Sequence, residues 1–477
     1  MSFSISPNRW AALTLIVVAQ FMVVLDMSVV NVALPAMKTD LGFSESGLQW
    51  VITAYAIVFG GFLLLGGRLG DLFGRRRLFM IGLLVFVAGS ALSGLAWSSG
   101  SLIAFRAVQG LGGALFAPAG LSLLMTTFTE GRGRNLAIGV WAAASGSGGA
   151  AGVLLGGVLT SYLSWPWIFL VNVPVGLAVI ALTPRFIGEA KRIDGARHFD
   201  LAGAVTVTSS LMIFVYALTY ATQHSWGSAM TIGLLAISAV LLAAFVQVER
   251  RAASPLMPLD IFKVRTLAAG NVITVILASV AFSTFFLLAL YLQQVEHYSA
   301  AQTGVAFTAI ALPIATLSNV VGPLVRRVGA RPVLVLGLLL IVISESLMMR
   351  LPLHLNYAVD LLPAFLLLGV GNSLSWVSVT IASLAGVSPA DSGIASGIAN
   401  TARQVGGAVG LAVVSTIAAS YGGVDAADVT HGFRIAFDVL FVLSLVAVVV
   451  AAAFLTPREA EQVGAEDEAP ELLLEAA

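Results

Sequence analysis

Long runs of hydrophobic residues follow one another along the whole chain, interrupted by charged residues, prolines and clusters of glycine. A run of about 18 or more such residues is long enough to cross the roughly 30 Å hydrocarbon layer as an α-helix. Strands of a membrane β-barrel would alternate between apolar and polar residues, whereas these runs are continuous and rich in Ala, Leu, Val and Gly. The pattern predicts an all-α integral membrane protein.

Fourteen apolar segments can be separated in this way, which predicts fourteen transmembrane helices. Their centres fall near Phe21, Ile57, Val87, Leu115, Gly148, Gly176, Ser210, Ile237, Phe282, Thr316, Leu340, Ser373, Gly410 and Val446. An even number of spans places both termini on the same side of the membrane.

The basic residues are distributed unevenly between the two sets of loops. If the N-terminus is cytoplasmic, the outer loops keep only Lys38, Arg350 and Arg434, and clusters such as Arg75–Arg77 fall in inner loops. Lys and Arg near the ends of spans are retained on the cytoplasmic side. The distribution predicts a multi-pass protein of the cell (cytoplasmic, inner) membrane with both termini cytoplasmic.

The composition excludes several classes of function. Hydrophobic residues make up 58% of the 477 positions and charged residues 10%, too apolar a balance for a water-soluble domain. The chain has no cysteine, so disulfides and thiolate chemistry are excluded, and it has neither a metal-ligand cluster nor a P-loop. Its formal net charge of zero gives no electrostatic footprint for nucleic acid. We therefore expect no enzyme, no bound metal and no cofactor.

An acidic residue, Asp26, lies within the first predicted span, where ionisable groups are costly and are functional candidates by default. Gln20 and Asn31 are eleven residues apart and share another face of the same helix. A carboxyl group at this depth can lose and regain a proton as water enters from either side. Proton coupling is our preferred interpretation, and the alternative is a carboxyl held permanently by a neighbouring helix.

Two further charged residues lie within predicted spans. Arg106 shares a helix face with Gln109 and with two glycines. An arginine within a span needs hydrogen-bond acceptors from another helix, and the glycines allow that helix to approach closely. Glu345 lies near the outer end of its span and close to Arg350. We interpret Glu345 as an interfacial acid that extends toward water beside this arginine.

Glycines recur at intervals of four in the fifth span, at Gly148, Gly152 and Gly156, and Gly157 follows directly. Small residues at this spacing form a helix-packing face in lipid, which needs no function in transport.

Several segments resemble one transporter family. The loop GRLGDLFGRRR from Gly67 to Arg77 is similar to a signature of major facilitator superfamily transporters. Further similar segments are LDMSVVNVALP (25–35), RAVQG (106–110), WPWIFLVNVPVG (165–176) and SGIANTARQVGGAVG (396–410). Together with fourteen spans, these segments resemble the 14-spanner drug:proton antiporter family.

The resemblance implies a division of the chain into two six-helix bundles, 1–184 and 265–456, with two inserted helices and their flanking cytoplasmic loops in 185–264. The tail 457–477 is rich in Glu and Ala and has no aromatic residue, which predicts an acidic, disordered end. The resemblance also implies alternating access by rocking of one bundle against the other. Asp26 and Arg106 match the family's proton-coupling acid and arginine. Gly67, Asp71, Gly74, Arg75 and Arg76 match the family's cytoplasmic gating latch. The glycines of the fifth span match the family's antiporter motif, although Val153 stands where the family has proline.

The resulting prediction is an exporter that exchanges an amphipathic, cationic or neutral drug-like molecule for protons, without another cofactor, working as a monomer in the lipid bilayer. The alternative is a dedicated exporter of a single endogenous metabolite, antibiotic or lipid. The residues expected to bind substrate are Gln20, Asp26, Asn31, Tyr55, Phe282, Phe286, Asn372, Trp376, Asn400 and Gln404.

Overall fold

The computed structural model of the protein describes residues 8–43, 48, 50–128, 131–188, 200–252, 255, 257–387, 392–423 and 425–454. All regular secondary structure in these ranges is helical. The helices of the first half are α1 (Asn8–Leu41), α3 (Trp50–Phe73), α4 (Arg75–Gly94), α5 (Ser99–Thr127), α6 (Gly131–Tyr162), α7 (Trp167–Leu170) and α8 (Asn172–Phe186).

The rest of the chain continues the same pattern. The helices that follow are α9 (Leu201–His224), α10 (Ala229–Arg251), η1 (Leu259–Lys263), α11 (Arg265–Leu290), η2 (Tyr291–Val295), α12 (Ala300–Val328), α13 (Ala330–Met348), η3 (Tyr357–Leu361), α14 (Leu362–Leu384), α15 (Ser392–Tyr421) and α16 (Ala426–Phe454).

Eleven helices of the described chain are long and apolar enough to cross a membrane, or twelve if the bent helix α12 crosses as one span. Helices α3 and α6 include residues whose side chains lie outside the described set, and they contribute only the shorter apolar stretches Trp50–Leu63 and Leu136–Ser145 to this search. The predicted all-α, multi-pass membrane class is confirmed. The number fourteen and the side on which the termini lie remain predictions.

Helices of the first half pack against one another around α5. Helix α5 contacts both α3 and α4, while α1 packs along α6 and also contacts α5 and α8. In the middle of this group, the ring of Phe116 lies nearly perpendicular to the rings of Phe79 and Phe86 in T-shaped contacts, an arrangement that aromatic quadrupoles favour. The second half has its own extensive contacts, chiefly α13 with α14 and α11 with α15.

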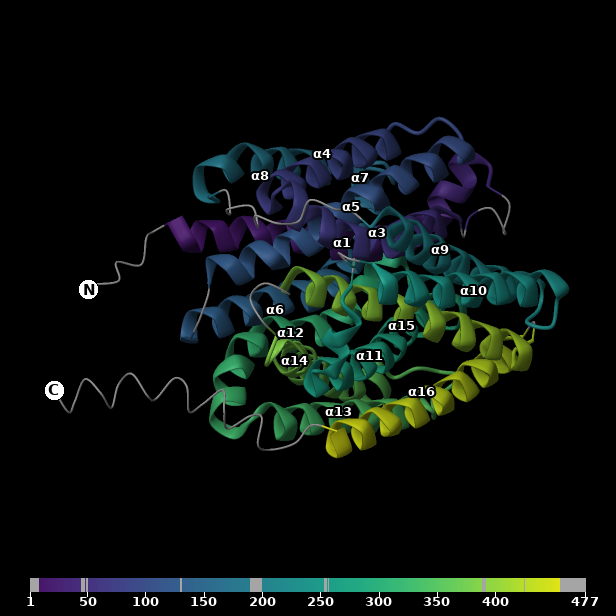
Figure 1. The fold of residues 1–477 in the computed structure, drawn as a ribbon. Helices are drawn as coiled ribbons and strands as arrows, with labels where there is room; N and C mark the ends of the chain where they lie inside the picture. The colour runs from purple at the N-terminus through teal and green to yellow at the C-terminus, as the bar shows by residue number, and fades with distance from the viewer. Residues whose placement is uncertain are drawn as a thin grey trace.

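The two halves meet along helices from both. Helix α6 packs along α12, and α3 packs along α15 on another side of the molecule. Helix α9 contacts both α3 and α15, and α10 packs on α9, so this pair lies across the junction of the halves (Figure 1). Trp50 of α3 contacts the ring of Tyr216 of α9, and Trp226 Nε1 donates a hydrogen bond to Thr416 Oγ1 of α15.

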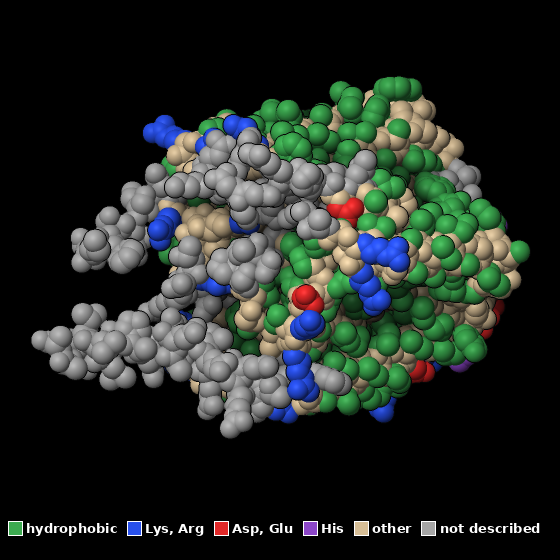
Figure 2. Space-filling view, viewed as in Figure 1, with side chains coloured by type: hydrophobic (Ala, Val, Ile, Leu, Met, Phe, Trp, Pro, Cys, Tyr) green, Lys and Arg blue, Asp and Glu red, His purple; other side chains and the backbone are tan. Residues whose placement is uncertain are grey.

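The surface agrees with a protein immersed in lipid. Hydrophobic side chains cover much of the face shown in Figure 2, while Lys and Arg appear mainly on its left and in its centre. Valines such as Val240 of α10 and Val449 of α16 expose 67% and 65% of their surface. Exposed apolar surface of this extent would be unfavourable in water and is expected of helices that face hydrocarbon.

Candidate functional site

Asp26 of α1 is fully enclosed, with 0% of its side chain exposed. Its Oδ2 lies 2.6 Å from Nη1 of Arg106 on α5, whose side chain is 1% exposed. Gln109 joins this pair from the next turn of α5: its Oε1 accepts a hydrogen bond of 2.6 Å from Arg106 Nη1, and its Nε2 donates one of 2.7 Å to Asp26 Oδ1. The three side chains form a closed ring.

Two more polar side chains hold this ring. Asn172 at the start of α8 donates from Nδ2 to Asp26 Oδ1 at 3.3 Å and to Ser90 Oγ at 3.2 Å. Ser90 of α4 also accepts from Gln109 Nε2 and donates its own proton to the carbonyl of Phe169. Residues from α1, α4, α5 and α8 therefore meet at one carboxylate, and the cluster is called the Asp26 network below.

Arg106 is held on its other side by α3. Its Nε donates to the carbonyl of Val51 at 3.1 Å, and its Cζ lies 4.4 Å from the ring centroid of Tyr55 and 5.4 Å from that of Phe169. Aromatic faces stabilise a guanidinium where water is excluded. A buried charge of this kind is tolerated because it is paired with a countercharge and hydrogen-bonded through Nε and Nη1.

The network contains residues that the sequence analysis did not assign to the site. Asn172 lies within the segment 165–176 that carries part of the family resemblance, but its role could not be assigned from spacing. Ser90 is one of many serines in the apolar segments, and nothing in the sequence distinguished it as a site residue. Asp26 was expected to attract a cationic substrate, whereas its carboxylate is enclosed and paired with Arg106 within the first half.

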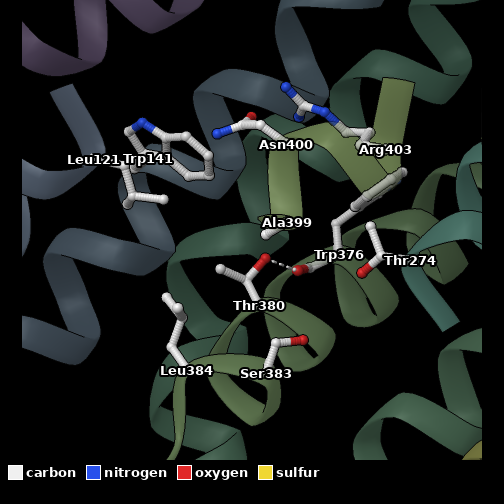
Figure 3. A pocket seen from close by; sticks show the side chains of 10 residues that line it. All are labelled: Leu121, Trp141, Thr274, Trp376, Thr380, Ser383, Leu384, Ala399, Asn400 and Arg403. Atoms are coloured by element: carbon white, nitrogen blue, oxygen red, sulfur yellow. Dashed lines mark hydrogen bonds between the residues drawn. The ribbon is translucent and has the colours of Figure 1, made fainter. Parts of the chain in front are cut away.

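A small cavity lies where the two halves meet, and it is separate from the Asp26 network (Figure 3). Its volume is about 40 Å³, enough for a few water molecules and well below the size of a drug site. The first half contributes Leu121 of α5 and Trp141 of α6. The second half contributes Thr274 of α11, Trp376, Thr380, Ser383 and Leu384 of α14, and Ala399, Asn400 and Arg403 of α15.

Arg403 is the charged side chain among the residues that line this cavity. Sequence analysis missed it, although an arginine eleven residues into an apolar helix was a visible signal. In Figure 3, Asn400 and Arg403 lie along one edge of the cavity, with Trp141 and Trp376 on opposite sides. The ring of Trp376 is fixed by a hydrogen bond of 3.1 Å from its Nε1 to Asn372 Oδ1.

Trp376 and Asn400 are thus the predicted substrate residues that line the cavity, and the others lie elsewhere. Gln20 bonds to Ser145 of α6, while Asn31 is exposed and bonds to carbonyls of its own helix. Asn372 is buried behind Trp376.

Four more of these predictions fall outside the cavity. Phe282 packs beside Gly407, and Phe286 is partly buried against the core of the second half. Gln404 faces Gly60, where α15 meets α3. Tyr55 lies against Arg106 in the Asp26 network.

The predicted latch lies at the turn between α3 and α4. Gly74 precedes α4 with a φ of 98°, a conformation that favours glycine. Arg75 is buried, Arg76 donates from Nη1 to the carbonyl of Ile187 after α8, and Gly67 is buried within α3. The side chain of Asp71 lies outside the described set, so the latch stays a prediction.

The glycines of the fifth span face α1. A Cβ atom at Gly148 would lie 3.0 Å from Val24 Cβ, and one at Gly152 would lie 2.7 Å from the carbonyl oxygen of Leu25. A Cβ atom at Gly156 would lie 2.9 Å from Val29 Cγ2. These residues let the backbones of α1 and α6 approach closely, on the helix that also carries Asp26. Gly157 is buried in the same helix.

The interpretation of Glu345 as an interfacial acid is wrong. Glu345 is 0% exposed and its Oε1 lies 2.7 Å from Thr284 Oγ1 of α11, whereas Arg350 is exposed and has no described ion pair with it. Position along the span suggested the interface, but the packing of α13 against α14 and α16 turns this side chain inward.

The sequence is similar to a family of transporters and to individual resistance and export proteins. The family model of the Major Facilitator Superfamily matches residues 16–410 and 271–476. A puromycin resistance protein of Streptomyces alboniger is 40% identical over 445 residues, which cover 90% of this chain and 88% of that protein. A cephamycin export protein of Amycolatopsis lactamdurans is 41% identical over 412 residues, 86% of this chain and 85% of that protein.

The fold is also similar to a solved structure. The crystal structure of the human organic anion transporter MFSD10 (TETRAN) superposes with a TM-score of 0.67, covering 94% of this chain and 100% of that chain. At 15% sequence identity, this likeness concerns the fold alone.

Proposed function

This chain belongs to the Major Facilitator Superfamily, a family of transporters rather than enzymes, and we propose that it is a secondary active exporter that exchanges a small amphipathic molecule for protons. The names of its relatives, which refer to puromycin resistance and cephamycin export, support efflux as the direction of transport. The cavity between the two halves supports a substrate path along their junction.

The proposed architecture has fourteen spans. The halves 1–184 and 265–456 rock against each other, the two helices within 185–264 lie across their junction, and both termini are cytoplasmic. In support, α9 contacts one helix from each half. The small cavity volume is consistent with a state in which the halves have closed around the substrate path.

The Asp26 network carries the proposal of proton coupling. As a carboxylate, Asp26 accepts three hydrogen bonds, from Arg106, Gln109 and Asn172. A protonated carboxyl group has an O–H that needs an acceptor, whereas the three atoms bonded to Asp26 are all N–H donors, so protonation disturbs this arrangement. Because the donors come from α5 and α8, binding a proton at Asp26 of α1 changes how these helices are held together.

Transport in proteoliposomes tests this proposal. Ethidium, naphthalene-2-sulfonate and the neutral naphthalene-2-sulfonamide form a panel, and a pH gradient with acid on the receiving side is imposed. We expect efflux of at least one compound to follow the gradient in the wild type and to lose this dependence in Asp26→Asn. Asp438→Asn, which neutralises an exposed carboxyl group of α16, is the matched control. Gradient-driven efflux that persists in Asp26→Asn would remove Asp26 from the coupling mechanism.

A dedicated exporter of one endogenous compound is the second candidate. The names of the two relatives refer to single antibiotics, puromycin and cephamycin, which favours this version. If expression protects a sensitive host against one antibiotic but not against dyes or quaternary ammonium compounds, the dedicated exporter is supported. Protection against many unrelated compounds would decide for broad specificity.

A further inference from the structure

The charged residue that lines the cavity between the halves is an arginine, whereas Asp26 had suggested a negative charge that attracts cations. Arg403 lines this cavity, and its Nε is buried without a hydrogen-bond partner. Among the described residues, no carboxylate forms an ion pair with Arg403 and no acid lines the cavity. Arginine keeps its positive charge at any physiological pH. The cavity therefore has a net positive lining.

Asp26 does not compensate this charge. Its carboxylate is bound to Arg106, Gln109 and Asn172 within the first half and is fully enclosed there. A cationic substrate in the cavity would add a second positive charge beside the partly buried Arg403, where screening is weaker than in bulk water. An anionic group would instead give the guanidinium its missing partner.

The remaining walls indicate what else the occupant carries. Trp141 and Trp376 provide planar apolar surfaces from opposite halves of the protein. Asn400, one turn before Arg403 on α15, and Thr380 of α14 add polar groups near the cavity. A ligand that matches these walls has an aromatic or otherwise apolar body and a single acidic group at one end.

We propose that Arg403 anchors an anionic group of the transported molecule, so that the substrate class is amphipathic organic anions. The planar guanidinium suits carboxylates and sulfonates because it donates two parallel hydrogen bonds to them. This inference rests on the proposed export function, but it makes a separate claim about charge.

The small volume of the cavity has a consequence for the transport cycle. Helices α14 and α15 approach α6 and α5 around it, so the cavity must widen before a drug-sized molecule enters. Closing an empty cavity removes water from an unpaired guanidinium, which is unfavourable. A bound anion removes this cost and so favours closure of the loaded transporter.

Equilibrium dialysis of purified full-length protein in lipid nanodiscs tests the claim about charge. The probes are naphthalene-2-sulfonate and naphthalene-2-sulfonamide, which share one aromatic body and differ in charge. We expect the wild type to bind the sulfonate about tenfold or more tightly than the sulfonamide. Arg403→Gln is expected to lose at least tenfold in affinity for the sulfonate, with unchanged affinity for the sulfonamide, and Arg403→Lys is expected to lie between.

Arg350→Gln is the matched control, since it removes the same charge from an exposed arginine beyond the end of α13. Retained binding of the sulfonamide and a monodisperse elution profile establish that Arg403→Gln is folded. Equal affinity of wild type and Arg403→Gln for the sulfonate overturns the proposal. Absence of saturable sulfonate binding to the wild type, or preference for the neutral probe, overturns it as well.

The two proposals fail in different ways. If ethidium or the sulfonamide follows the pH gradient while the sulfonate neither binds nor moves, export stands and the anion proposal is rejected. If no compound moves in proteoliposomes, the export function is rejected, while dialysis still reports whether Arg403 binds anions.

Discussion

Arg106 Nη1 lies 2.6 Å from Asp26 Oδ2, although 80 residues separate the two along the chain. Each residue alone would be an isolated charge in an apolar helix bundle. Together with Gln109 they form a compact ring that water does not reach. The pair joins α1 to α5 at the carboxylate that we propose to bind the proton.

The energetic coupling of this pair can be measured directly. Asp26→Asn leaves the buried Arg106 without its countercharge, and removal of one partner of a buried ion pair costs about 3–5 kcal/mol. We expect the double variant Asp26→Asn, Arg106→Gln to be destabilised by clearly less than the sum of the single variants. Unfolding in detergent, followed by tryptophan fluorescence, gives the double-mutant cycle. Additive effects would show that the two side chains do not interact.

Asn172 is expected to support Asp26 by orientation. Asn172→Ala removes donors to Asp26 Oδ1 and Ser90 Oγ, and loss of a buried hydrogen bond to a charged group costs about 1.5–3 kcal/mol. We expect the gradient-driven efflux rate to fall about tenfold, which corresponds to roughly 1.4 kcal/mol. Asn31→Ala, at an exposed position of α1, should leave the stability and the gradient-driven efflux rate near those of the wild type. Equal behaviour of the two variants would contradict the assigned role.

The contact between α1 and α6 has no room for a side chain at Gly152. Gly152→Ala would place its Cβ 2.7 Å from the carbonyl oxygen of Leu25, and a larger side chain there would push α1 and the Asp26 network aside. Backbone shifts of this kind typically cost about 1–3 kcal/mol. The yield of folded protein and its thermal unfolding midpoint should both fall.

Gly149, in the same helix, provides the control for this prediction. A Cβ atom there meets nothing within 4 Å. Gly149→Ala is therefore expected to be neutral or to stabilise by up to about 1 kcal/mol, because alanine is the better helix former. Equal loss of stability in the two variants would mean that helix packing is not the reason for glycine at 152.

Glu345 is expected to act as a neutral hydrogen-bonding group. Thr284 Oγ1 has one proton and two acceptors in reach, Val280 O at 2.9 Å and Glu345 Oε1 at 2.7 Å, and no described cation pairs with the acid. If the threonine donates to Val280, a protonated Glu345 completes the second bond. Glu345→Gln, which offers an N–H in its place, should keep stability to within about 1 kcal/mol and keep gradient-driven efflux.

Removal of the whole side chain should have a different result. Glu345→Ala leaves a cavity and an unmatched Thr284, so we expect a loss of about 2–4 kcal/mol in thermal unfolding experiments. If Glu345→Gln instead abolished the dependence of efflux on the pH gradient, Glu345 would be a second proton-binding residue and the structural role would be rejected.

Much of the architecture could be predicted from the sequence because lipid imposes a simple constraint. Every backbone polar group in hydrocarbon must be bonded within the protein, in a helix or in a closed β-barrel, and runs that are apolar at every position rather than at alternate ones fit the helix. The same constraint makes Asp26, Arg106 and Glu345 visible as candidates, since charged residues are rare in such runs. Trp376 and Asn400 were also predicted to bind substrate, and both line the cavity.

The sequence by itself therefore determined the helical membrane class, and it identified Asp26 and Arg106 as candidate functional residues because charged side chains are rare within spans. Only the tertiary structure decided that these two pair with each other, that Asn172 and Ser90 complete their network, that Glu345 turns inward, and that Arg403 supplies the charge of the cavity. The physical reason is that hydrophobicity acts on each segment separately and without direction, whereas a hydrogen bond or an ion pair requires two particular atoms within about 3 Å. Helix packing, which joins residues distant in the chain, sets those distances.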